Sequence, residues 1–270
     1  MAADLPPLND GAPHGDPPFL LESGWTPLLN GRNLDGWTVA YPANRSNSWV
    51  ATRGVFWDGS GDGQTLLPAP GLGDRIVNAP GGKPTNVQIA TTRKFGDVEL
   101  YIEFLVPRRS NSGVFLHGLY EISILDSYGV PNEKLTSGHC GGIYQRWIID
   151  GSNEHAPSPG GYADSANGKG VGGTPPRVNA ARPAGEWQSF QVWFQAPRFD
   201  ASGKKTANAK FIRVLHNGVL IHENVEAEGP TRTHMEIPEA PTSPLMLQGD
   251  HGPVAFRNIY IRPLRPLAKR

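Results

Sequence analysis

The chain has 270 residues, with 25 basic and 25 acidic side chains, so its formal net charge is zero. Nucleic-acid binding needs a basic face that neutralises phosphates, and the absence of any basic cluster argues against a polyanionic partner. Cys140 is the only cysteine, which excludes an intrachain disulfide and a cysteine zinc site, and no run of ~18 apolar residues predicts a membrane span.

The first 22 residues are polar and rich in proline, and they predict an extended or disordered arm before a single domain over residues 23–270. This arm lacks the basic start and apolar run of a signal peptide. The stretch "AADLPP" resembles the end left by cleavage after a small residue, which favours a periplasmic or extracellular protein with an added Met. A native cytoplasmic start is the alternative.

Short apolar stretches then recur between clusters of Gly, Pro, Asn and Asp, and the chain holds 33 Gly and 26 Pro, which disfavour long helices. Strands are predicted, in chain order, at residues 48–58, 87–95, 98–106, 112–118, 120–127, 187–197, 209–218, 219–227, 244–250 and 254–262. Asn217-Gly218 predicts a tight hairpin turn between two of them. Residues 131–184 are poor in strand signals and too long for an ordinary connection. The pattern indicates an all-β, two-sheet jelly-roll sandwich.

Alternation along these strands separates a core face from an outer face. In "YEISILDS", Ile122 and Ile124 share one face and Glu121 lies on the other. If the strands belong to one sheet, its outer face presents Tyr101, Glu103, His117, Glu121, Trp193 and Gln248. Aromatic rings beside carboxylates and amides suit a sugar, because its C–H face stacks and its hydroxyls form hydrogen bonds.

An ordinary solvated sheet face is the alternative for each residue taken singly, but Trp193 and Tyr101 have little reason to lie on one. Trp193 is predicted to stack on the sugar, with Tyr144 of "GGIYQRW" closing one side of the pocket. Cys140 is predicted to be a buried structural thiol. Asp126, Arg257 and Asn258 are predicted to be structural, at strand ends or in buried ion pairs.

Five blocks of the sequence resemble the 3-keto-disaccharide hydrolase domain family, in the family's order from Gly24 to Leu264. They are "GWTPLLNGRNLDGW", "SNSGVFLHGLYEISILDSYG", "NAARPAGEWQSFQVWFQAPRFDASGKK", "HNGVLIHENVEAEGPT" and "PLMLQGDHGPVAFRNIYIRPL". The match is close around Asn111–Gly113, Tyr120–Glu121 and Gln248–Gly252. Ser123 stands where the family often has Gln, and Gly249 is inserted in the usual "LQDHG". The resemblance implies a concanavalin-like jelly roll that acts on glycosides oxidised at C3.

A ketone at C3 acidifies the C2 proton, so a base removes it, the C1 substituent leaves, and water then adds. Glu121 or His117 is the predicted base, with Glu103 as a further catalytic candidate and His251 and Gln248 as substrate contacts. One divalent cation held by Glu103, Glu121 and His251 is a speculative cofactor that would polarise the ketone.

Two other functions remain open at this point. Lectins use the same sandwich, so a non-catalytic sugar-binding module is the first alternative. A retaining hydrolase with two opposed carboxylates is the second, although the chain lacks a clustered Glu-x-Asp-x-x-Glu strand. The oligomeric state is not predicted.

Overall fold

The computed structural model describes residues 23–41, 44, 46–47, 49–79, 86–149, 168–232 and 235–264. The predicted arm at residues 1–22 lies outside this range, as do residues 150–167 of the long connection. Within the described residues the chain is built of strands, and its helical content is one short 3-10 turn, η2 (Asn132–Lys134). No helix of these residues has the length and apolar character that crossing a bilayer requires.

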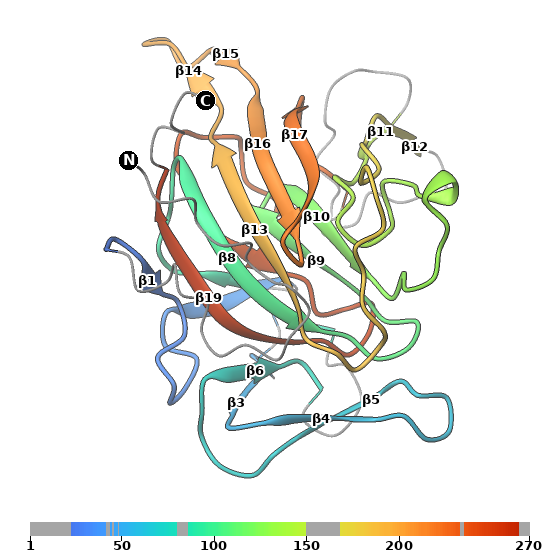
Figure 1. The fold of residues 1–270 in the computed structure, drawn as a ribbon. Coiled ribbons are helices and arrows are strands. Elements are labelled where there is room, and N and C mark those ends of the chain that lie inside the picture. The colour runs from blue at the N-terminus through green and yellow to red at the C-terminus, as the bar shows by residue number, and fades with distance from the viewer. Residues whose placement is uncertain are drawn as a thin grey trace, which may run out of the picture.

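The larger sheet is antiparallel and has the strand order β17–β16–β13–β8–β19–β6–β3, with β1 paired to β19. Its long strands β8, β13, β16 and β19 lie in front of β9 and β10 in Figure 1. The strands are β1 (Thr26–Pro27), β3 (Val50–Thr52), β6 (Arg75–Val77), β8 (Val98–Leu105), β13 (Gln188–Gln195), β16 (Ala209–His216), β17 (Val219–Ala227) and β19 (Ala255–Pro263).

The smaller sheet has the order β10–β9–β18–β7–β2. Its strands are β2 (Trp37–Tyr41), β7 (Gln88–Thr91), β9 (Asn111–Leu116), β10 (Tyr120–Leu125) and β18 (Met246–Leu247). Three two-stranded ribbons complete the fold: β4 (Val55–Asp58) with β5 (Thr65–Pro68), β11 (Arg146–Ile149) with β12 (Gly168–Val171), and β14 (Arg198–Phe199) with β15 (Lys205–Ala207).

The core lies between the two sheets, where alternate residues of each strand meet. Ile102 and Phe190 come from the larger sheet, and Val114 and Ile122 come from the smaller one; all four are fully buried in one cluster. Two antiparallel sheets that face each other across such a core make the predicted jelly-roll sandwich, which the structure confirms.

Several local predictions are also confirmed or corrected. The hairpin at Asn217-Gly218 joins β16 to β17, and both turn residues have positive φ, 51° and 81°, as a tight primed turn requires.

The predicted strand at 48–58 is instead two strands, β3 and β4, interrupted at Gly54. The ribbon β4–β5 then packs Trp57 and Leu66 against the outer side of the larger sheet through Val77, Leu105 and Ala255.

Candidate active site on the smaller sheet

The outer face of the smaller sheet bears two neighbouring rows of side chains, which we call the Glu121 face. Strand register places Glu121 opposite Phe115, Phe115 opposite Met246, and Met246 opposite Ala90. The adjacent row is polar and contains Ser123, Gly113, Gln248 and Gln88. Glu121, Ser123 and Gln248 are each at most 5% exposed. The buried carboxyl therefore lies among polar groups and next to an apolar floor.

Gly113 explains how the Glu121 side chain is placed. Gly113 lies opposite Ser123 on the neighbouring strand, and a Cβ there would be 2.9 Å from Glu121 Oε1 and 2.9 Å from the Phe115 ring. Real Cβ atoms do not approach other atoms this closely, so only glycine leaves room for the carboxyl to lie across β9. The side chain is thereby directed toward Gln248, whose backbone N–H donates to Gly113 O at 3.0 Å.

Burial determines the protonation of Glu121. Removal from water disfavours the carboxylate and raises the pKa of Glu121 to about 8. The Ser123 hydroxyl, which donates to Oε1 at 3.3 Å, opposes this shift, while the negative charge of Asp250 adds to it. At neutral pH the side chain is therefore mainly a protonated acid, poised near the operating range of an acid–base catalyst.

Strand β18 leads directly into a second polar group. Asp250 Oδ1 accepts a hydrogen bond from His251 Nδ1 at 2.7 Å, and Gln248 Nε2 lies 3.2 Å from the same nitrogen. The Asp250 side chain is 5% exposed, whereas that of His251 is 45% exposed and accessible to a substrate. The bond to Asp250 raises the pKa of His251, against burial and the positive charge of Arg232. Asp250 thus orients the imidazole and leaves Nε2 available.

Tyr144 lies beside Glu121 at the free edge of β10. Ile143 forms an isolated bridge with Ile122, and Tyr144 N–H donates to Glu121 O at 3.1 Å. Because Ile143 and Ile122 both face the core, alternation places Tyr144 on the Glu121 face. Tyr144 therefore lies beside Glu121 and on the opposite side of the sandwich from Trp193, with which it was predicted to form the pocket.

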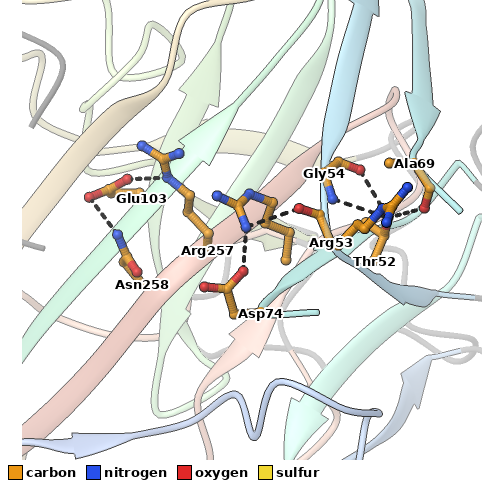
Figure 2. A network of polar contacts seen from close by, with 9 residues as sticks. Thr52, Arg53, Gly54, Ala69, Asp74, Glu103, Arg257 and Asn258 are labelled. Carbon is orange, nitrogen blue, oxygen red and sulfur yellow. Dashed lines mark hydrogen bonds and ion pairs between the residues drawn. The ribbon is translucent and has the colours of Figure 1, made fainter. Parts of the chain in front are cut away.

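Glu103 and Tyr101 belong to the other sheet, so the prediction of one shared face is wrong. Glu103 accepts from Tyr101 Oη at 2.9 Å, from Arg257 Nε at 2.5 Å and from Asn258 Nδ2 at 3.0 Å. Figure 2 shows Glu103 between Arg257 and Asn258, and Arg257 lies 4.2 Å from the Trp187 ring centre. Glu103 is thus neutralised in a structural network, as predicted for Arg257 and Asn258.

Trp193 also lies on the outer face of the larger sheet. It is opposite Glu99 on one side and Arg213 on the other, and the Arg213 guanidinium is 5.6 Å from its ring centre. Its half-buried position is not a core position, which agrees with the alternation of β13. The ring is nevertheless on the opposite side of the sandwich from Glu121. It therefore cannot stack on a sugar that is bound beside Glu121.

His117 does not face the substrate side either. The prediction extended strand alternation to this residue, but its φ of 57° places it in the turn between β9 and β10. Its ring packs 5.2 Å from Phe194 and 6.3 Å from Tyr120, with Nε2 3.3 Å from Gly96 O. Burial lowers the pKa of His117, so it is a neutral side chain packed against core aromatics.

The predicted metal set does not fit this geometry. Glu103 and Glu121 lie on different sheets, so they cannot bind one ion with His251. Among the described residues no group of three His, Cys, Asp or Glu side chains has metal-binding proximity. The predicted set of Glu103, Glu121 and His251 is therefore not one site.

Two residues of the site were not identified from the sequence: Gly113 and Asp250. Gly113 stands out in the sequence only within a family block, although a glycine inside a strand is a signal of close approach.

Cys140 is buried, as predicted for a structural thiol, and burial raises the pKa of this thiol to about 12.

Comparison with known proteins places the chain among carbohydrate-active proteins. A candidate glycosyl hydrolase of Parabacteroides distasonis is 25% identical, with a TM-score of 0.57, 90% of this chain covered and 84% of the other. A second candidate glycosyl hydrolase of that organism is 15% identical, with a TM-score of 0.52 and coverages of 90% and 95%. A search among curated proteins found no match. The model of the 3-keto-α-glucoside-1,2-lyase-like domain matches residues 24–262, and the chain belongs to that carbohydrate-active family.

Proposed function

We propose that the protein cleaves 3-keto-glucosides by elimination across C1 and C2, with Glu121 and His251 as the acid–base pair. The observation that supports this most directly is the buried Glu121 carboxyl, whose pKa is raised to about 8 and which lies across strand β9 from Gln248 and the Asp250–His251 pair. Family membership supports the substrate class.

The reaction needs one base and one acid. The base takes the C2 proton, the C2–H electron pair enters an enolate on the C3 oxygen, and collapse of the enolate forms C1=C2 as the C1–O bond breaks. The leaving oxygen takes a proton from the acid. Addition of water across C1=C2, with hydroxide to C1 and a proton to C2, completes net hydrolysis.

The two environments suggest which group does which step. His251 Nε2 is accessible while Nδ1 donates to Asp250, so the neutral imidazole suits proton abstraction. Glu121 is protonated at neutral pH and suits donation to the leaving oxygen. This reverses the predicted role of Glu121 as base. The Gln248 amide supplies hydrogen-bond donors beside both groups, where enolate charge develops.

A matched pair of variants tests the proposal. Glu121→Gln keeps the size of the side chain and removes its titration, and we expect release of the aglycone from a 3-keto-glucoside to fall ~10²-fold or more. Glu103→Gln changes an equally buried carboxyl on the other sheet and should leave turnover by the folded protein unchanged. Aglycone release is measured by chromatography, and circular dichroism verifies folding.

Turnover by Glu121→Gln at the parent rate would refute the assignment of Glu121. Saturable binding of the 3-keto-glucoside by the parent protein without any release would instead favour a sugar-binding module. A periplasmic or extracellular location stays a prediction.

A further inference from the structure

A cavity, which we call the arginine cavity, lies at the far end of β10 from Glu121. It has a volume of about 550 Å³ and is lined by Trp57, Arg108, Arg109, Asp126, Tyr128 and residues 183–186. Asp126 follows Glu121 by five residues, which is roughly 16 Å along a strand. The cavity is therefore separate from the acid–base pair.

The wall of the cavity is built from segments distant in sequence. Gly63 O accepts hydrogen bonds from Trp57 Nε1 at 2.9 Å and from Arg108 N at 3.0 Å, which ties ribbon β4–β5 to the turn after β8. Gly185 packs so closely on the Trp57 ring that a Cβ would lie 2.1 Å from it. The Arg108 guanidinium lies 5.7 Å from the centre of the same ring. Arg108 is thus held as a stacked, planar donor group.

Arg109 has a backbone conformation that a non-glycine residue rarely adopts. Its φ is 55°, and the turn is held because Arg109 N–H donates to Asp126 Oδ2 at 3.0 Å. Glycine would take this conformation without the Cβ penalty. An exposed arginine kept at such a position indicates that the side chain has a use.

The chemistry of the lining points to a particular ligand. Neither guanidinium forms an ion pair with a carboxylate in the part of the chain that the structure describes. Tyr128 lines the cavity and is 61% exposed, so its aromatic ring is accessible to a ligand. Paired guanidiniums match a carboxylate, an aromatic face matches a pyranose ring, and Asp126 and Glu186 can accept from hydroxyls.

We propose that the arginine cavity binds a saccharide that bears a carboxylate, a uronic acid residue, independently of the reaction at Glu121. Its carboxylate contacts Arg108 and Arg109, and its ring stacks on Tyr128. The neutral net charge of the whole chain agrees with recognition of one acidic residue rather than of a polyanion.

Calorimetric titration with two matched probes tests this site. The probes are a disaccharide ending in glucuronic acid and the same disaccharide after reduction of its carboxyl group. We expect the acidic probe to bind about tenfold more tightly, since charged hydrogen bonds are the stronger ones, and this preference should shrink as salt is added. Equal affinity for both probes, or no binding of either, would overturn the proposal.

Variants locate the binding. Arg109→Gly should abolish most of the preference while the melting temperature rises or stays unchanged, because glycine relieves the left-handed backbone. Tyr128→Ala should weaken the binding of both probes, because both stack on its ring. Arg93→Gln is the control and should keep the preference for the acidic probe, since Arg93 is, like Arg108, an exposed arginine stacked on an aromatic ring, 5.2 Å from the Phe95 centre. Unchanged affinity in Arg109→Gly would overturn the proposal. Glu121→Gln should still bind the acidic probe. A failure of the uronic acid proposal can therefore be told apart from a failure of the proposed reaction.

Discussion

Glu103 on β8 and Glu121 on β10 show how two buried glutamates close in sequence acquire different chemistry. Three donors surround Glu103, including the Arg257 guanidinium, and they compensate its charge. Among the described residues, one weak donor, Ser123, contacts the Glu121 side chain, and Asp250 lies nearby with a like charge. The first carboxylate is a structural anion, whereas the second is the one whose proton is available for chemistry.

The raised pKa of Glu121 makes a prediction about activity and pH. If protonated Glu121 donates to the leaving oxygen, kcat/KM should fall on the alkaline side of pH about 8, as the carboxyl ionises. An acid limb should follow protonation of His251. Both limbs are read from initial rates of aglycone release across pH. A profile that keeps rising beyond pH 9 would show that Glu121 acts in its ionised form, as base.

The packing of Glu121 over Gly113 predicts the effect of a single methyl group. Gly113→Ala places a Cβ within 2.9 Å of the carboxyl, so Glu121 must move and turnover should fall about tenfold or more. The overpacking should cost ~1–3 kcal/mol of unfolding free energy. Gly96→Ala is the control, because its nearest contact would be 3.3 Å and far from the site. Parent activity in a folded Gly113→Ala protein would contradict the placement of the carboxyl.

At the scale of the elements, pairing decides which strands bring their outer residues together. β13 pairs with β8 and β16, so Trp193, Tyr101 and Glu103 share the outer face of the larger sheet. β10 pairs with β9 in the smaller sheet, so Glu121 faces the other way. The turn at His117 similarly ends β9 at Leu116, two residues before the predicted end of the strand at residue 118.

Because Trp193 and Glu121 lie on different sheets, Trp193→Ala should not have the effect on substrate binding that the sugar-platform hypothesis predicts. The ring stacks under Arg213 on the larger sheet, so KM for a 3-keto-glucoside should stay within about twofold of the parent value. The lost cation–π contact and burial should lower stability by ~1–2 kcal/mol. Michaelis–Menten kinetics and thermal melts on one preparation measure both. A tenfold rise in KM would bring Trp193 back as a substrate contact.

At the scale of the whole molecule, three buried groups make stability depend on pH in opposite directions. Burial lowers the pKa of His216 to about 3 and that of His222 to about 4, from an ordinary 6.5. Their contribution is complete above pH 6.5 and is lost as the pH falls toward these folded values. Glu121 has a raised pKa, so its contribution is complete below 4.5 and is lost as the pH rises to about 8.

Melting curves of the parent protein and Glu121→Gln across pH isolate the carboxyl. Because the amide does not titrate, the variant should gain stability relative to the parent as the pH rises from 4.5 to about 8, after which the difference should become constant. The histidine contribution is common to both proteins and cancels. A difference that does not change with pH would show that Glu121 is not shifted in the folded state.

Alternation and turn chemistry are local properties, so the all-β class, the core face of each long strand and the hairpin at Asn217-Gly218 could be predicted from the residues alone. The sequence also pointed to Glu121, Gln248 and His251, which meet on one face. Only the three-dimensional structure shows that Glu103 belongs to the other sheet, that Gly113 makes room for the carboxyl, and that Asp250 orients His251. The first outcome depends on which strands pair at long range, as β9 does with β18. The other two depend on side-chain packing and hydrogen bonding between near neighbours, and no local pattern of residue types encodes any of the three.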